Sequence, residues 1–362
     1  CVLGTPNPTP PTSSHISLPT AFNWRSTDAL IGPKDDGTGI QGIKDPSVVF
    51  YDGVWHVFAS TASEANGYSI VYMNFTDWSE AGNASFFYLN QAPFGTGYRA
   101  APEIFYFTPQ KLWYLIYQNN NSAYSTSTNI SDPSLWTTPR TFYPSEPETV
   151  QENIGAGYWV DMWVICDDEN CHLFSSDDNG HLYRSQTPKT SFPHNMTEPV
   201  IAMEDPNRLN LFEASNAYKY GDGQYLLLVE CIGSDGHRFF RSWTMSDIAG
   251  PYTPLADTEA DPFARSNNVV FNDDGTPWTV DISHGEMIRA SHDENLLINP
   301  HNLQYLYQGD DPNNTAATYN AIPWRLALLT QTNPLLYGQC GSVSCRSVAN
   351  PRKHHQPSLI VD

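Results

Sequence analysis

Basic residues are scarce in this chain of 362 residues. Lys and Arg together number 18, Asp and Glu number 39, and the formal net charge is −21 at pH 7. Because such a surplus of negative charge repels phosphate backbones and anionic lipid surfaces, we expect neither nucleic acid nor a membrane surface as a partner. The sequence also contains no run of 18 or more apolar residues, which argues against a membrane-spanning helix.

None of the six cysteines lies in a Cys-x-x-Cys pair or at a zinc-like spacing from histidine. An even number of cysteines without such partners favours disulfides over a zinc site. Many pairings of six cysteines exist, so the sequence does not fix the connectivity. The candidates are the pairs that flank a short turn, Cys166 with Cys171 and Cys340 with Cys345, which would leave Cys1 and Cys231.

Features of an extracellular protein accompany this cysteine pattern. The sequence starts at Cys1 without Met, as expected after removal of a signal peptide. Six N-x-[ST] sequons occur, at Asn74, Asn83, Asn120, Asn129, Asn195 and Asn313. We therefore expect a secreted, extracellular glycoprotein. Residues 1–15 are rich in Pro, Thr and Ser and are expected to form a disordered leader or linker remnant, residues 16–346 the folded domain, and residues 347–362 a tail.

Long amphipathic helical patterns are almost absent, whereas aromatic residues make up 13% of the chain. Short β-branched and aromatic runs alternate with turn signals such as Asp-Gly, which indicates strands and hairpins. Aromatic rings stack on the faces of neutral sugars, but they also fill the cores of β-sheets. Composition alone therefore leaves both explanations of the aromatic content open.

A polar residue, a strand, a tight turn and a more apolar strand recur every fifty-odd residues. The repeats begin at Asp45, Glu103, Asp161, Glu213 and Asn268, and the hairpins cover residues 45–59, 103–117, 161–176, 213–229 and 268–283. A small sheet cannot bury both faces alone, so such units stack around an axis. The pattern predicts an all-β fold, a five-bladed β-propeller, with a sandwich of irregular hairpins as the alternative.

Four of the five repeats begin with a carboxylate, namely Asp45, Glu103, Asp161 and Glu213. The first strand of each propeller blade lines the central channel, so we expect these side chains to converge near one rim. Any one of them could be a solvated strand end, but bringing four like charges together is costly and indicates catalysis or cation binding. Two carboxyl groups around a sugar can hydrolyse a glycosidic bond, and a third can shift the pKa of the acid.

Six segments of the chain resemble glycoside hydrolase family 62, the α-L-arabinofuranosidases of fungi and bacteria. They are IKDPSVVF (43–50), WHVFAST (55–61), YWVDMW (158–163), NLFEAS (210–215), DISHGEMIR (281–289) and YNAIPWRL (319–326). The resemblance covers the chain from about residue 16 to about residue 340. It implies a five-bladed propeller that removes arabinofuranosyl side groups from arabinoxylan with inversion of configuration.

The resemblance also implies a role for three carboxyl groups. Asp45 would be the general base that activates water, and Glu213 the general acid that protonates the leaving oxygen. Asp161 would raise the pKa of that acid and orient it. Inversion further implies a separation of roughly 6.5–9.5 Å between the carboxyl groups of Asp45 and Glu213, which leaves room for a water molecule.

Further residues are candidates for sugar binding. The resemblance places Lys44 against arabinose hydroxyls, although strand alternation would aim one of Lys44 and Asp45 away from the channel. Trp113 could stack on sugar or belong to the core of its strand. Tyr319 follows a polar stretch that indicates an exposed loop, so we expect Tyr319 and the adjacent Asn320 to contact the xylan main chain.

The segment DISHGEMIR supplies three more candidates. The resemblance implies that His284 lies beside a structural calcium ion and reaches it partly through water, since calcium prefers oxygen ligands. Arg289 is expected to bind a sugar hydroxyl or a carboxylate, with a surface ion pair as the alternative. Glu286 is interpreted as structural, and so is Glu103 in the second repeat. The chemistry itself requires no cofactor.

The predicted activity has two competitors. A family 43-type propeller, which would be a β-xylosidase or an arabinanase, uses a similar set of two Asp and one Glu. A non-catalytic propeller could bind plant polysaccharide without cleaving it. The presence of both Asp45 and Glu213 favours an enzyme. We expect arabinoxylan and arabinoxylo-oligosaccharides as substrates, and a monomer.

Overall fold

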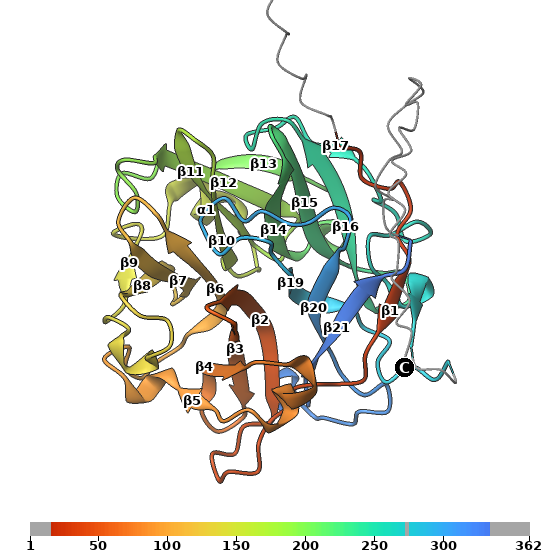
Figure 1. Cartoon of the computed structure of the whole chain (residues 1–362). Coiled ribbons are helices and arrows are strands. Elements are labelled where there is room, and N and C mark those ends of the chain that lie inside the picture. Colours follow the sequence, from red (N-terminus) through yellow and green to blue (C-terminus); the bar gives the residue numbers. More distant parts are fainter. Residues whose placement is uncertain (1–15, 272–274, 334–362) are drawn as a thin grey trace, which may run out of the picture.

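The computed structural model describes residues 16–271 and 275–333, and in these ranges the main strands form five sheets around a central axis (Figure 1). The inner strand of each sheet contacts the inner strands of both neighbouring sheets, which closes the ring. The predicted five-bladed β-propeller is thereby confirmed. The expectations for residues 1–15 and 347–362, and those for Cys1, Cys340 and Cys345, concern residues outside the described ranges.

The first four blades are antiparallel meanders whose innermost strand comes first in the chain. In blade 1 these strands are β2 (Gly42–Tyr51), β3 (Val54–Ser63), β4 (Gly67–Phe75) and β5 (Phe87–Tyr88), and in blade 2 β6 (Ala100–Phe107), β7 (Leu112–Gln118), β8 (Ser122–Ser127) and β9 (Arg140–Thr141). The turn between β2 and β3 has positive φ at both Asp52 (51°) and Gly53 (79°). A two-residue turn with positive φ at both positions matches the twist of the two strands that it joins. Asp and Gly tolerate this conformation, so the Asp-Gly pair correctly indicated a hairpin.

Blades 3 and 4 repeat this arrangement. Blade 3 contains β10 (Val160–Cys166), β11 (Asn170–Ser176), β12 (His181–Pro188) and β13 (Val200–Glu204), and blade 4 contains β14 (Glu213–Gly221), β15 (Gln224–Ile232), β16 (Arg238–Met245) and β17 (Thr253–Pro254). The inner hairpins of all four blades coincide with those predicted from the repeat.

The fifth blade differs from the prediction. Its strand order is β18-β1-β21-β20-β19, from β18 (Val269–Val270) through β1 (Trp24–Ser26), β21 (Arg325–Gln331) and β20 (Gln304–Gly309) to β19 (Ser283–Met287). The predicted hairpin at 268–283 was wrong. Val269 and Val270 pair in parallel with β1 at the outer edge, and the inner strand begins only at Ser283. A short apolar run before Asp-Gly suggested a local hairpin, but its partner comes from the N-terminal part of the chain.

The strand β1 closes the propeller. It pairs antiparallel with β21, so the two ends of the described chain share one sheet. Trp24 anchors this strand: its side chain is fully buried, and its Nε1 donates a hydrogen bond to the carbonyl oxygen of Phe263 at 2.6 Å. The rings of Trp24 and Phe263 also pack edge to face, with 5.2 Å between their centres.

A β-bulge interrupts the inner strand of each of the first four blades at one equivalent position. The residue at the bulge has a positive φ, which is 49° at Asp45, 50° at Ala101, 57° at Asp161 and 51° at Ala214. This left-handed backbone is uncommon outside glycine, and bulges near active sites re-aim side chains. In β19 the register shifts at His284. The regular alternation of side chains is therefore interrupted in all five inner strands.

Helices in the described ranges are short and lie in the connections between strands. They are α1 (Glu148–Asn153) and the 3₁₀ turns η1 (Trp78–Asn83), η2 (Leu89–Gln91), η3 (Pro133–Leu135), η4 (Arg208–Asn210), η5 (Ser266–Asn268) and η6 (Tyr319–Ala321). Across residues 16–271 and 275–333, no helix has the length and apolar character needed to cross a bilayer.

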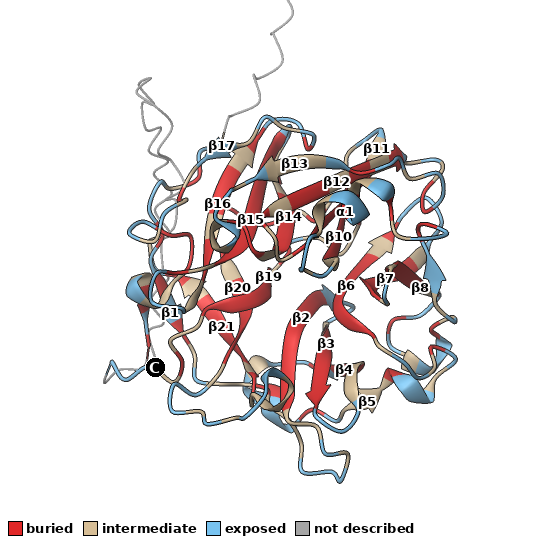
Figure 2. Ribbon diagram, turned by 180° about the vertical axis from the view of Figure 1, so that it is seen from behind, coloured by how far each residue is buried: buried red, intermediate tan, exposed pale blue. Residues whose placement is uncertain are grey.

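The hydrophobic core lies between the faces of neighbouring blades, and exposed residues gather in the outer strands and connections (Figure 2). Many of its largest members are aromatic, including Phe58, Phe105, Tyr218 and Tyr305. Cys166 and Cys171 form a disulfide across the turn between β10 and β11, as predicted. Cys231 is buried and forms no disulfide within the described residues.

Candidate active site

The bulge in β2 brings two consecutive side chains together at the propeller axis, in the cluster of Lys44, Asp45, Asp161 and Glu213 that makes up the carboxylate pocket. In an unbroken strand Lys44 and Asp45 would point to opposite faces of the sheet. The positive φ of Asp45 breaks that alternation, and the two residues are only 8% and 4% exposed. Lys44 Nζ lies 3.3 Å from Asp45 Oδ1. The bulge therefore explains how a lysine and its neighbouring aspartate can serve the same site.

Asp45 is held at the axis by groups from blades 1 and 5. Its backbone amide donates to Gln308 Oε1 at 2.6 Å. Its Oδ1 lies 3.4 Å from His284 Nδ1, in addition to its contact with Lys44. These contacts fix the carboxylate in one orientation, and a carboxylate held in this way could exchange a proton with one water molecule.

Asp161, at the bulge of β10, links the pocket to the fourth blade. Its Oδ2 accepts a hydrogen bond from the amide of Ala214 at 2.8 Å, and Ala214 directly follows Glu213. Its own amide donates to Gln118 Oε1 at 2.9 Å. Burial, followed by the charges of Glu213 and Asp45, raises the pKa of Asp161 well above its ordinary value. Asp161 therefore orients the segment that carries Glu213 and favours its own protonated form.

Glu213 precedes the bulge of β14 and forms an ion pair with Arg238 of the same blade. Burial acts to raise the pKa of Glu213, but the charges of Arg238 and Lys44, with hydrogen bonds from Arg238 and Asp178, lower it overall. The role that the resemblance gives to Asp161, which is to raise the pKa of this acid, stays a prediction. The guanidinium of Arg238 contacts Glu213 directly. Without substrate, the neighbouring carboxyl groups of Asp161 and Asp178 therefore hold a proton more firmly than Glu213 does.

Sequence reasoning missed Arg238 and Glu230. Arg238 bridges Glu213 and Glu230, and Glu230 is fully buried on β15. Glu230 also accepts hydrogen bonds from Ser283 Oγ at 3.0 Å and from the amide of His284 at 2.6 Å. Burial, with the charge of Glu213, raises the pKa of Glu230 to about 7 against the opposing effect of Arg238. A lone glutamate inside the apolar run LLLVEC was the available signal.

Two tyrosines flank Lys44 at the mouth of the pocket. Lys44 Nζ donates to the hydroxyl of Tyr319 at 3.1 Å, and lies 4.9 Å from the centre of the Tyr319 ring and 5.5 Å from that of Tyr68. Tyr319 is 41% exposed and begins η6, and the half-buried Asn320 follows it. Tyr319 and Asn320 thus lie where a polymer outside the pocket could contact them.

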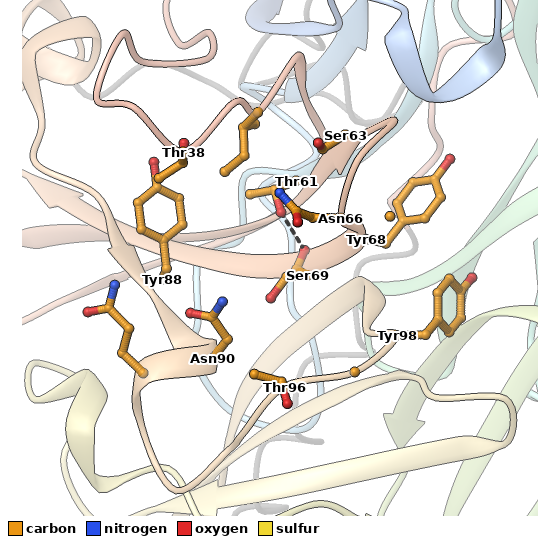
Figure 3. Close-up of a pocket in the computed structure, with 14 residues that line it drawn as sticks. Thr38, Thr61, Ser63, Asn66, Tyr68, Ser69, Tyr88, Asn90, Thr96 and Tyr98 are labelled. Atoms are coloured by element: carbon orange, nitrogen blue, oxygen red, sulfur yellow. Dashed lines mark hydrogen bonds between the residues drawn. The ribbon is translucent and has the colours of Figure 1, made fainter.

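A groove of about 510 Å³ opens beside Tyr68 and Tyr98 (Figure 3). None of its fourteen lining residues is charged, and they include three tyrosines and three side-chain amides. The Oγ atoms of Ser63 and Ser69 are buried in its wall without a hydrogen-bond partner among the described residues. Tyr98 is hydrogen-bonded to Gln118, which also binds the amide at the β10 bulge. The groove therefore begins at the wall of the carboxylate pocket.

Trp113 does not reach the pocket. It is 2% exposed and packs against Tyr51, Tyr106 and His292. It lies five residues along β7 from Gln118, a distance of roughly 17 Å in an extended strand. The suggestion that Trp113 stacks on sugar is corrected: its ring belongs to the core of the blade.

Arg289, Glu286 and Glu103 form a second polar layer along the axis. Arg289 Nε lies 2.6 Å from Glu286 Oε1, and its guanidinium donates to carbonyl oxygens of β2 and β6 at 2.9 and 2.7 Å. Glu103 lies two residues beyond the bulge at Ala101 and accepts a hydrogen bond from the amide of Val164. Arg289 therefore pairs with a carboxylate. Its Nη2 serves the inner strands, its buried Nη1 has no hydrogen-bond partner among the described residues, and its contact with a sugar hydroxyl stays a prediction.

The described residues do not provide a calcium site made of direct ligands. In residues 16–271 and 275–333, no group of three or more His, Cys, Asp or Glu side chains is arranged to hold a metal ion. His284 Nδ1 instead faces Asp45 Oδ1 at 3.4 Å and Asp161 Oδ2 at 3.7 Å. Calcium takes six to eight oxygen ligands, so an ion near His284 would depend on water for most of them.

The pocket has the components of acid and base hydrolysis. Asp45 is held beside His284, Glu213 precedes the bulge of the neighbouring inner strand, and Asp161 fixes the backbone beside Glu213. Lys44 and Arg238 supply hydrogen-bond donors for the hydroxyl groups of a sugar. Carboxyl groups that converge at the axis of this propeller fit a glycoside hydrolase, in which a pair of carboxyl groups flanks the bond that is broken.

The chain belongs to glycosyl hydrolase family 62, whose family model matches residues 23–330. α-L-Arabinofuranosidase C of Cellvibrio japonicus is 44% identical over 322 residues, and the match covers 88% of this chain but 48% of that protein. The chain thus spans about half the length of this curated relative.

Solved structures share the fold along nearly their whole length. The catalytic domain of a family 62 α-L-arabinofuranosidase from Coprinopsis cinerea is 62% identical, with a TM-score of 0.86, and the match covers 88% of this chain and 99% of that one. A family 62 hydrolase in complex with xylotriose is 56% identical, with a TM-score of 0.83, and the match covers 86% of this chain and 98% of that one.

Proposed function

We propose that this chain is an inverting α-L-arabinofuranosidase that removes arabinofuranosyl side groups from arabinoxylan and arabinoxylo-oligosaccharides. The observation that carries the proposal is the bulged pair Asp45 and Asp161, which meet Glu213 around one axial pocket. Membership of family 62 and the activity named for its relatives support the choice of sugar.

In the proposed reaction Asp45 takes a proton from a water molecule whose oxygen attacks the anomeric carbon of arabinofuranose. Glu213 gives a proton to the xylose oxygen, and the glycosidic bond breaks as the bond to water forms. Asp45 then returns its proton to solvent and Glu213 regains one, so no proton is consumed overall. Attack from the face opposite the leaving group yields the β anomer of the sugar.

The uncharged groove beside Tyr68 and Tyr98 supports a neutral polysaccharide as substrate. Tyrosine rings and side-chain amides suit sugar faces and hydroxyls, and a lining without charge is unusual in a chain whose net charge is −21. The relative in complex with xylotriose supports a xylan main chain. We infer that this chain passes the pocket mouth at Tyr319 and Asn320 and continues into the groove.

We further propose that the protein is secreted, glycosylated and monomeric. All six sequon asparagines identified in the sequence are exposed, and the disulfide between Cys166 and Cys171 fits an oxidising compartment. Expression with and without a glycosidase treatment, followed by intact mass, tests the glycans. Light scattering tests the monomer.

A calcium ion near His284, held mainly through water, stays a prediction from the family resemblance. Neither the acid nor the base step is assigned to it, since carboxyl groups carry out the proposed proton transfers. Metal analysis of protein dialysed against calcium and then against buffer checks it. A calcium content below one ion per two chains would contradict it.

The activity is tested by the products released from wheat arabinoxylan. We expect free arabinose without xylo-oligosaccharides, and no release from linear arabinan, which separates this enzyme from a family 43-type β-xylosidase or arabinanase. Glu213→Ala should bind xylan normally and release nothing. Binding without release by the unmodified protein would instead indicate a non-catalytic polysaccharide-binding propeller.

A further inference from the structure

A fourth carboxyl group reaches the acid side of the pocket from the turn between β11 and β12. Asp178 adopts a left-handed backbone conformation in this turn, with a φ of 56°. The preceding residue, Asp177, is fully buried and organises the turn: Oδ1 accepts from the amides of Asn179 (2.8 Å) and His181 (3.2 Å), and Oδ2 accepts from the hydroxyl of Tyr183 (2.8 Å). Asp178 is thus presented by a turn whose conformation is fixed by its neighbour.

The turn is also braced from outside its own hairpin. The carbonyl oxygen of Asp177 accepts a hydrogen bond from the amide of Tyr158 at 3.1 Å. A side chain at Gly157 would place its Cβ only 1.9 Å from that oxygen, so the two segments are packed backbone to backbone. Arg208 donates to the carbonyl oxygen of Asp178 at 2.9 Å. Two further segments of the chain therefore hold Asp178 in place.

The side chain of Asp178 is hydrogen-bonded to that of Glu213. Two carboxyl groups can form such a bond only if they share a proton, because two ionised carboxylates offer acceptors alone. Oδ1 of Asp178 is buried, and no N–H donor or hydroxyl group among the described residues reaches it. The charged and titratable groups that surround Asp178 are Glu213, Asp161, Arg238 and, through its backbone, Arg208.

Electrostatics indicate which of the two partners holds the proton. Burial, and then the charges of Glu213 and Asp161, raise the pKa of Asp178 to about 9 against the opposing charge of Arg238. The pKa of Glu213 is lowered, as described above, with Asp178 among the causes. Before substrate binds, the proton therefore resides on Asp178, while its acceptor, Glu213, is the residue that must deliver a proton to the leaving oxygen.

We propose that Asp178 is a positioning residue for the general acid, which orients the carboxyl group of Glu213 and supplies the proton that Glu213 passes to the leaving xylose oxygen. The proton moves from Asp178 to Glu213 and then to the xylose oxygen, and Asp178 regains one from water after product leaves. No atom is exchanged beyond this proton. The inference rests on the proposed hydrolysis and adds a fourth carboxyl group to it.

Asp178→Asn separates proton supply from the shape of the turn. Asparagine tolerates the left-handed conformation and its amide can still donate a hydrogen bond to Glu213, but it cannot pass on a proton. We expect kcat on arabinoxylan at pH 7 to fall by about tenfold or more, which is part of the roughly 10²–10⁴-fold that general acid–base catalysis contributes. We also expect the alkaline side of the kcat profile to move to lower pH, with KM little changed.

A substrate with a good leaving group gives the second readout. A 4-nitrophenyl arabinofuranoside needs little protonation of its leaving oxygen, so Asp178→Asn should retain most of the unmodified enzyme's activity on it. Asp168→Asn is the matched control, because Asp168 is an exposed carboxylate at the opposite end of β11. It should match the unmodified enzyme in both assays.

The outcomes distinguish this inference from the proposed function. If Glu213→Gln loses activity on arabinoxylan while Asp178→Asn keeps the activity and the pH profile of the unmodified enzyme, the role of Asp178 is overturned and the hydrolase stands. If Glu213→Gln retains activity, the proposed hydrolysis itself fails. An equal loss by Asp178→Asn on both substrates contradicts proton supply. Asp178→Ser, measured in the same way, replaces Asp178→Asn if the latter does not fold.

Discussion

Lys44 and Asp45 are consecutive residues of β2, yet both side chains enter the pocket because the bulge places Asp45 in a left-handed conformation. Outside glycine this conformation costs about 1–2 kcal/mol, although aspartate tolerates it better than most residues. The same conformation recurs at Asp161. Backbone strain at functional sites persists when the surroundings enforce it, here through side-chain amides that bind the amides of Asp45 and Asp161.

Asp161 gives a residue-scale prediction for stability as well as activity. Its folded-state pKa lies above that of the unfolded chain, mainly because of burial, so the native state binds the proton more tightly. The unmodified protein therefore loses stability as pH rises from about 4, the unfolded value, towards the folded pKa. Asp161→Asn has no ionisable group at this position and does not lose stability in this way. The free energy of unfolding of the variant, relative to that of the unmodified protein, should therefore increase between pH 5 and pH 8.

Urea unfolding at the two pH values measures this difference. The variant should also lose arabinose release by about a hundredfold or more. Its Oδ1 can still accept from the amide of Ala214, but it cannot carry the charge or the proton through which Asp161 acts on Glu213. A relative stability that falls with pH would show that Asp161 is stabilised as a carboxylate in the folded protein, contrary to the argument.

Among the elements, the inner strands decide which residues reach the pocket. The bulge lies at the same place in the first four inner strands, so the position of a residue relative to the bulge, and not its place in the sequence repeat, decides where its side chain lies. Glu103 shows the effect: it lies two residues beyond the bulge of β6 and binds the amide of Val164 in the second layer. Glu213 lies one residue before the bulge of β14, as Lys44 does in β2.

Gly285 gives a prediction at the scale of one element. A Cβ at this position would lie 2.1 Å from the carbonyl oxygen of Leu306 and 2.8 Å from the Cα of Tyr307, both backbone atoms of β20. Gly285→Ala must therefore separate β19 from β20. We expect a loss of about 1–3 kcal/mol in the free energy of unfolding, as for other overpacked sites.

Because His284 precedes Gly285, the same variant should reduce kcat more than it raises KM. Chemical denaturation and steady-state kinetics at one temperature check both effects. Unchanged unfolding together with unchanged kcat would mean that the two strands are free to separate, and would contradict the role assigned to their close packing.

The whole molecule depends on closure of the ring by β1. The side chain of Trp24, the first residue of β1, is fully buried and packs against Phe263. We expect Trp24→Ala to lower the free energy of unfolding by about 3–5 kcal/mol, as for other large-to-small core substitutions. Thermal unfolding followed by circular dichroism measures the change. A shift no larger than that of an exposed substitution such as Tyr158→Ala would show that β1 does not hold the ring together.

At this scale the sequence predicted the propeller, the first four inner hairpins and the carboxyl groups Asp45, Asp161 and Glu213 around one pocket. It could not predict the fifth blade, whose sheet joins both ends of the described chain and leaves no local pattern. It also missed Arg238 and Asp178. Both reach the pocket from outside the inner strands, where the sequence repeat does not predict which residues face the axis.

In the proposed mechanism Asp45 activates a water molecule opposite the bond that Glu213 helps to break. Proton NMR of the first sugar released from arabinoxylan shows whether this is so. We expect β-arabinofuranose to appear first and to convert to the equilibrium mixture afterwards. An initial signal from the α-furanose anomer would mean that the configuration is retained, and would contradict the assignment of Asp45 as a base acting on water.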